Sequence, residues 1–270
     1  MNQSSLFQAA RECLLINAVD DKLQRTDEVA EAWRSGLLGL DGGHAAEQIT
    51  DAGHPPKPEL VHPSQLPRRG LGSEEGRLAL IHAIVHIEFN AINLAWDAVQ
   101  RFPGMPPDYY SNWVQVAKEE ARHFRLLRGR LQEAGADYGD FPAHNGLWDM
   151  AVRTADDPLV RMALVPRMLE ARGLDVTPAI MQRFRKAGDI RTVDVLQIIL
   201  TDEIGHVEFG SRWFSYLCEQ RGLDPETTYF DLLNNFLNGE IRCPLHREAR
   251  LQAGFSEHEL DRLEMLCTRH

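Results

Sequence analysis

The chain has 270 residues, of which 43% are hydrophobic and 26% are charged. This composition is typical of a globular protein with a substantial core, and at roughly 150 residues per domain the length allows one large domain or two small ones. Basic residues number 29 and acidic residues 40, so the formal net charge is −11. Such a charge repels phosphate backbones and therefore disfavours general nucleic-acid binding.

Three further features bear on where the protein works. No run of about 18 apolar residues is present, so we expect no membrane-spanning segment. The N-terminus has no basic segment followed by a long apolar stretch, so we expect no export signal and a cytoplasmic protein. The four cysteines lack a Cys-x-x-Cys pair, and we expect reduced thiols rather than a disulfide framework. These cysteines are Cys13, Cys218, Cys243 and Cys267.

Helical periodicity dominates the chain, and no clear alternating strand pattern is found. We expect one or two helices in residues 4–35. Residues 37–73 are rich in Gly and Pro, which predicts a long loop that wraps over the rest of the protein. The histidines in this loop are expected to be solvated rather than to bind a metal. They are His44, His54 and His62.

Four long helical segments follow this loop. They are expected at residues 73–101, 106–135, 157–188 and 189–221. Helix-breaking residues predict an interruption of the third segment between Gly173 and Pro178. Two shorter helices are expected after them, at residues 226–238 and after Ser256, which can form a capping box with Glu259.

Each long segment carries one glutamate in the middle of an apolar stripe. In the first, for example, Glu88 lies three or four residues from Val85, Ala91 and Ile92. An isolated buried carboxylate costs several kcal/mol or becomes neutral, so four of them in one core need positive charge nearby. Two divalent cations would neutralise four carboxylates. The glutamates are Glu88, Glu120, Glu170 and Glu203.

The spacing of these glutamates also indicates a shared site. Glu88 and Glu120 are 32 residues apart with a proline-rich turn about midway, so two antiparallel helices bring them to the same depth. Glu170 and Glu203 are 33 residues apart. A histidine follows Glu120 and Glu203 by three positions, which places a carboxylate and an imidazole on one helix face. This order is typical of a duplicated helix pair in a four-helix dimetal-carboxylate bundle.

Neighbouring residues suggest supporting roles. Asp202 and Glu119 each precede a glutamate of the predicted site, and such carboxylates often accept the other N–H of a ligand histidine. Glu119 is the weaker candidate, since it is also compatible with simple solvation. Pro166 precedes Glu170 by four residues and predicts a kink beside the site. A packed or surface role is expected for two histidines off the Glu88 face, His82 and His86.

The layout resembles the ferritin-like superfamily of di-iron carboxylate proteins. Five stretches, and the tail at residues 244–255, are similar to the bacterial ferritin-like family catalogued as domain of unknown function 455. The stretches are PRRGLGS (67–73), HAIVHIE (82–88), KEEARHF (118–124), EARGLDVTP (170–178) and DEIGH (202–206). The resemblance covers roughly residues 5–260, and the family has no settled substrate.

This resemblance implies an all-α fold with a ferritin-like four-helix bundle at residues 74–222 and additional N-terminal and C-terminal helices. Residues 1–36 would pack on the bundle, residues 37–73 would form the wrapping loop, and residues 223–270 would form the C-terminal helices. The resemblance also implies six metal ligands. They are Glu88, Glu120, His123, Glu170, Glu203 and His206.

We therefore expect an oxidoreductase with two iron ions, although Mn/Fe or Mn/Mn pairs also suit these hard ligands. It would activate O2 to hydroxylate or otherwise oxidise a small organic substrate, with an electron-donor protein as a further partner. The alternatives are a ferroxidase or metal-handling protein, a tRNA-modifying hydroxylase, which the net charge disfavours, and a structural bundle with a vestigial site. No phosphate-binding loop or Ser-His-Asp arrangement supports a kinase or hydrolase.

Overall fold

The computed structural model describes residues 4–41, 49–66, 72–237 and 241–267, and this part of the chain is all-α. Its strands are the two-residue parallel pair β1 (Ser4–Ser5) and β2 (Leu38–Gly39). The chain forms two compact units, Met1–Val152 and Arg153–His270, so the predicted bundle of residues 74–222 extends over both. His44 and residues 67–71 of the predicted PRRGLGS motif lie outside the described residues.

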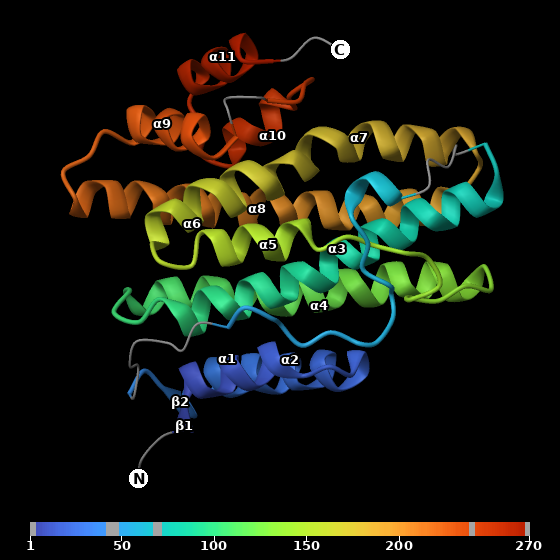
Figure 1. Cartoon of the computed structure of the whole chain (residues 1–270), viewed down its shortest axis with the longest axis horizontal. Helices are drawn as coiled ribbons and strands as arrows, with labels where there is room; N and C mark the ends of the chain where they lie inside the picture. Colours follow the sequence, from blue (N-terminus) through green and yellow to red (C-terminus); the bar gives the residue numbers. More distant parts are fainter. Residues whose placement is uncertain (1–3, 42–48, 67–71, 238–240, 268–270) are drawn as a thin grey trace. The chain divides into compact units, whose positions relative to one another are not determined.

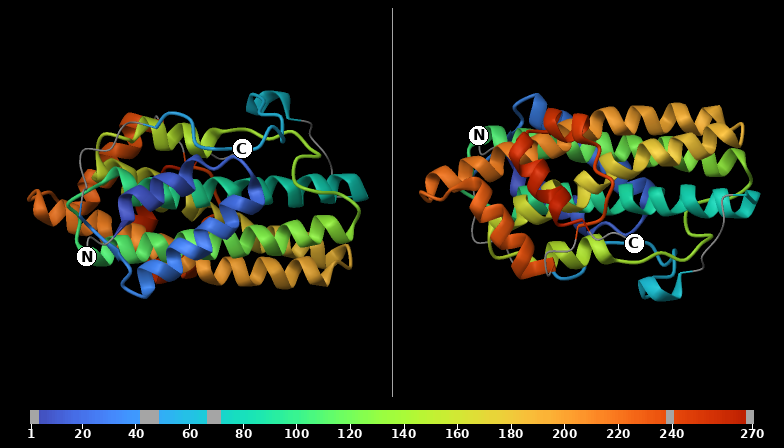
Figure 2. Two further views of the ribbon diagram at one scale, coloured as in Figure 1. Left: turned by 90° about the horizontal axis from the view of Figure 1, so that it is seen from below. Right: turned by 90° about the horizontal axis from the view of Figure 1, so that it is seen from above.

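The first unit is built on two long helices, α3 (Glu74–Arg101) and α4 (Pro107–Glu133). The hydroxyl of Ser73 accepts a hydrogen bond from the backbone N–H of Gly76, as expected of an N-cap, and Gly104 turns the chain with φ 88°. Figures 1 and 2 show α1 (Leu6–Leu15) and α2 (Val19–Arg34) in blue, lying across α3 and α4. Two short elements complete this part, the 3-10 turn η1 (Pro63–Gln65) and α5 (Gly146–Arg153).

Helix α3 is the core helix of the first unit. Among the described helices it is long and apolar enough to cross a membrane by length and composition, but 67% of its apolar window is buried within the fold. A helix in the core of a fold passes the same test of length and composition, because the sides that other helices cover are apolar.

A buried lysine joins α1 to α3. Lys22 is fully buried, and its Nζ donates hydrogen bonds to the carbonyl oxygens of Cys13 and Leu14 at 2.9 and 3.0 Å and to Oδ1 of Asn93 at 2.6 Å. The two carbonyls belong to the last turn of α1, where backbone acceptors lack helical partners. Burial lowers the pKa of Lys22 to about 7. The lysine thus closes the end of α1 against the core helix.

The second unit is built on α6 (Pro158–Leu164), the π-helical segment η2 (Val165–Glu170), α7 (Ala171–Lys186) and α8 (Ile190–Gln220). The predicted interruption between Gly173 and Pro178 is wrong, because α7 continues through both residues. The irregularity lies earlier, in η2. Pro166 has no backbone N–H and obstructs the preceding turn, so regular α-helical bonding breaks at this point.

Three short helices complete the second unit: α9 (Pro225–Leu237), α10 (Arg247–Gln252) and α11 (Glu257–Met265). The predicted capping box of Ser256 and Glu259 is confirmed at the start of α11. The prediction of four reduced cysteines is wrong for two of them, because Cys243 and Cys267 form a disulfide with Cα atoms 5.7 Å apart. Tertiary structure brings them together, since Ile241 and Cys267 form a β-bridge. Cys13 and Cys218 are free and buried.

Candidate metal site

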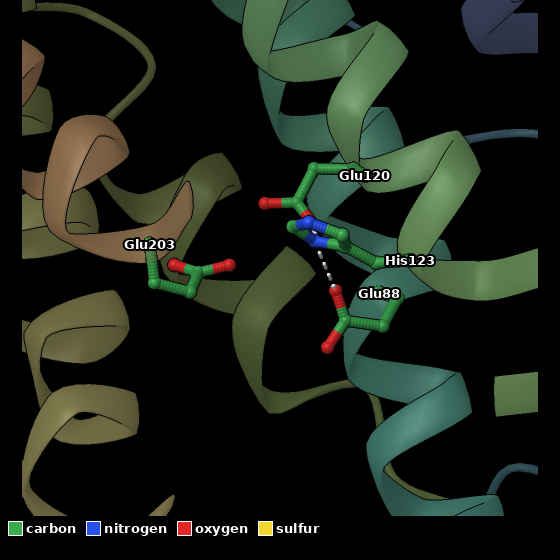
Figure 3. A group of neighbouring side chains, drawn as sticks. All are labelled: Glu88, Glu120, His123 and Glu203. Atoms are coloured by element: carbon green, nitrogen blue, oxygen red, sulfur yellow. Dashed lines mark hydrogen bonds and ion pairs between the residues drawn. The ribbon is translucent and has the colours of Figure 1, made fainter. Parts of the chain in front are cut away.

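Three of the six predicted ligands converge in the core of the first unit. Glu88 comes from α3, and Glu120 and His123 come from adjacent turns of α4, as Figure 3 shows. Their exposed fractions are 3%, 1% and 0%. Nδ1 of His123 lies 3.2 Å from Oε2 of Glu120 and 3.3 Å from Oε2 of Glu88. Each residue offers a ligand atom, and these atoms lie within 4.8 Å of one another.

The electrostatics of this cluster favour a cation. Burial, and then the charge of Glu120, raise the pKa of Glu88 well above its ordinary value. Burial disfavours the protonated form of His123, but hydrogen bonds with Glu120 and Glu88 outweigh it and raise the pKa of His123 to about 11. The imidazolium proton therefore offsets part of the negative charge. Carboxylate oxygens and an imidazole nitrogen are also donors for iron or manganese, so the residues fit a metal ion.

The other three predicted ligands lie in the second unit. On α8, Nδ1 of the buried His206 lies 3.5 Å from Oε1 of Glu203, whose side chain is 14% exposed. Glu170 is the last residue of η2 and is half-buried, with its Oε2 atom inside the protein. Because η2 packs on α8, the second unit holds two carboxylates and one imidazole on adjacent elements. Figure 3 also labels Glu203.

The two predicted supporting carboxylates have different surroundings. Oε1 of Glu119 accepts a hydrogen bond of 3.0 Å from Nε2 of Gln115 at the surface of α4. There Glu119 lines a groove of about 740 Å³ between α2 and α4, together with Trp33 and Arg122. Asp202 is half-buried on α8, next to Glu203. A role for either carboxylate in orienting a ligand histidine stays a prediction.

A packed or surface role was predicted for His82 and His86, and the structure shows the packed one, since both are buried. Nε2 of His82 accepts a 2.9 Å hydrogen bond from the N–H of Gly139, and Nδ1 of His86 lies 2.9 Å from the hydroxyl of Tyr138. Sequence reasoning missed Tyr138, because it lies in a Gly- and Asp-rich loop after α4. Its ring also contacts Phe89 and Phe124, the chain neighbours of two predicted ligands.

Comparisons with known proteins point to one family. A family model described as "Protein of unknown function (DUF455)" matches residues 15–261. An "Uncharacterized protein" of Haemophilus influenzae is 46% identical over 217 residues, which cover 78% of this chain and 75% of that protein. No solved structure matches.

Proposed function

The chain belongs to the DUF455 family, and we propose from its site that it is a dimetal carboxylate oxidoreductase. The observation that carries this proposal is the buried cluster of Glu88, Glu120 and His123. Two carboxylates in a core, with partial compensation from one proton, form a site that a divalent cation stabilises.

We further propose that the second helix pair completes the site. Its Glu-x-x-His sequence on α8 repeats that of α4, and Glu170 precedes it as Glu88 precedes Glu120. The six ligands would then hold two iron ions, or a Mn/Fe or Mn/Mn pair. Such a pair would supply the redox chemistry by which O2 oxidises or hydroxylates a small organic substrate, with electrons from a donor protein. Supporting roles for Asp202 and Glu119 belong to the same proposal.

The chain's own residues would prepare this site. His123 would give up the proton that it shares with the two carboxylates if it held a metal ion, because a ligating imidazole must be neutral. The apolar neighbours Phe89 and Phe124 exclude water from the first helix pair, since both are buried. Their packing on Tyr138 fixes the two ring positions beside Glu88 and His123.

A cytoplasmic location belongs to this proposal as well. The free thiols of Cys13 and Cys218 agree with it, whereas the Cys243–Cys267 disulfide is more typical of oxidising compartments. The redox state of these cysteines in protein isolated under non-reducing conditions therefore bears directly on this assignment.

The proposal is tested by anaerobic loading with Fe(II) followed by exposure to O2. An oxidoreductase of this kind should bind two ions per chain. Beyond the single O2 that its two Fe(II) ions can reduce, it should consume O2 continuously only when an electron donor is supplied, and faster when a substrate is present. Oxidation of many Fe(II) per chain with retention of the product would instead indicate a ferroxidase. A folded protein that binds no Fe(II) would contradict both.

A further inference from the structure

A buried arginine in the second unit has an unusual set of neighbours. Arg167 lies in the middle of η2 and is 3% exposed. Its guanidinium carbon is 5.0 Å from the ring centre of Phe214, 4.4 Å from that of Tyr229 and 4.5 Å from that of Phe255. These are cation–π distances, and such contacts are strongest where water is excluded.

Two hydrogen bonds complete the environment of Arg167. Nε donates to the hydroxyl of Ser211 on α8 at 3.1 Å, and a terminal nitrogen donates to Oε1 of Glu259 on α11 at 2.8 Å. Glu259 is itself held in place, because its Oε2 accepts the N–H of Ser256 in the capping box. The first turn of α11 is therefore tied directly to η2.

The backbone of η2 is also held from outside. The hydroxyl of Tyr229 on α9 donates a 3.1 Å hydrogen bond to the carbonyl oxygen of Arg167. A π-helix is rare and replaces the ordinary i→i+4 bonding by i→i+5, so its backbone groups need such partners. Both the side chain and the carbonyl of Arg167 are thus fixed by the C-terminal helices.

The register of η2 matters because Glu170 is its last residue. A return to α-helical bonding would remove one residue from the widened turn and rotate Glu170 relative to α6 by roughly 100°, the step of one helical residue. Such a rotation would move a carboxylate out of any position in which it shares a metal with Glu203 and His206.

We infer that Arg167 and Glu259 are positioning residues, through which α9 and α11 hold η2 in the form that presents Glu170 to a metal ion. This inference rests on the proposed function. It assigns the C-terminal helices a part in building the metal site, although none of the six predicted ligands comes from them.

Two substitutions in the full chain test this role. Glu259→Gln removes the charge that pairs with the buried guanidinium, and Arg167→Lys keeps the charge but loses the planar group that stacks on three rings. Leu263→Ala is the matched control, because it removes a buried side chain from the same helix and leaves both residues intact. Uptake of Co(II), its visible absorption spectrum and amide hydrogen exchange in residues 165–170 are measured well below each protein's Tm.

We expect Glu259→Gln to weaken Co(II) binding at least 10-fold, to change the absorption spectrum and to speed exchange in residues 165–170. Arg167→Lys should do the same to a smaller extent, while Leu263→Ala lowers Tm with a wild-type spectrum. If both test variants keep the wild-type spectrum, Co(II) affinity and exchange rates, the inference is overturned but the proposed function is not. A wild-type protein that takes up no Co(II) would overturn the proposed function and this inference with it.

Discussion

Gly210 of α8 lies directly against Pro166 of η2. A Cβ atom placed on Gly210 would be 2.4 Å from Cβ and 2.5 Å from Cγ of Pro166, far inside normal contact. Gly210 follows His206 by one helical turn, and Pro166 precedes Glu170 by one turn. The close approach of these two residues therefore sets how near η2 and α8, the two elements of the second unit that carry predicted ligands, come to each other.

Gly210→Ala should consequently destabilise the protein and move η2 away from α8. Overpacking of this kind costs typically 1–3 kcal/mol, which denaturant unfolding measures. Gly129→Ala in α4 is the control, since nothing lies within 4 Å of its added Cβ. That variant should be unchanged or slightly more stable, because alanine has the higher helix propensity. If the Gly210→Ala protein is as stable as the wild type, η2 can shift to accept the added methyl group without cost, and this contact does not fix its position.

Replacement of the predicted ligands should remove metal selectively. Glu120→Gln and Glu203→Gln each delete one carboxylate charge, and we expect bound iron to fall from two ions per chain to one or none. Glu208→Gln alters a carboxylate of α8 that pairs with Arg212 at the surface and has no role in the proposed site, and this variant should retain its metal. Elemental analysis of the three purified variants distinguishes these outcomes. Full metal content in both ligand variants would refute the ligand assignment.

Acid should destabilise the protein through His82. Burial lowers the pKa of His82 to about 4, from an ordinary value of 6.5. Between these pH values the unfolded state binds more protons, so the free energy of unfolding falls as the pH falls, by roughly 1–3 kcal/mol. His82→Gln preserves an acceptor for the N–H of Gly139 and should reduce this dependence. Identical slopes for both proteins in urea unfolding at pH 7, 6, 5 and 4 would exclude His82 as the cause.

The disulfide can be checked by counting thiols. Protein denatured without reductant should expose two titratable thiols, from Cys13 and Cys218, and four after reduction. Cys267→Ser should destabilise the protein by about 3 kcal/mol, since the cross-link closes a loop of 24 residues in the unfolded chain. If four thiols react without reductant, the Cys243–Cys267 disulfide does not form and the prediction of four reduced cysteines is correct.

The long helices were predictable because local chemistry defines their ends. Ser73 accepts a hydrogen bond at the start of α3, and Asp189 does the same for α8. The Glu88, Glu120 and His123 cluster was equally accessible to sequence reasoning, because apolar residues flank each carboxylate at helical spacing.

The features that escaped prediction depend on contacts between distant residues. In the π-helix, Pro166 lies against Gly210 and Arg167 pairs with Glu259, and these partners are 44 and 92 residues away along the chain. The sequence predicted a kink at Pro166, which lies in η2, but not the π-helical form of this segment, and the further interruption expected at Gly173 is wrong. The pairing of Cys243 with Cys267 likewise depends on the fold of the C-terminal segment and has no local motif.

The metal content of the full chain tests the central claim most directly. Protein loaded anaerobically with Fe(II) and freed of excess metal should retain two ions per chain, with a higher Tm than the chelator-treated protein. A folded protein that retains no iron, and whose Tm is the same with and without metal, would contradict the account.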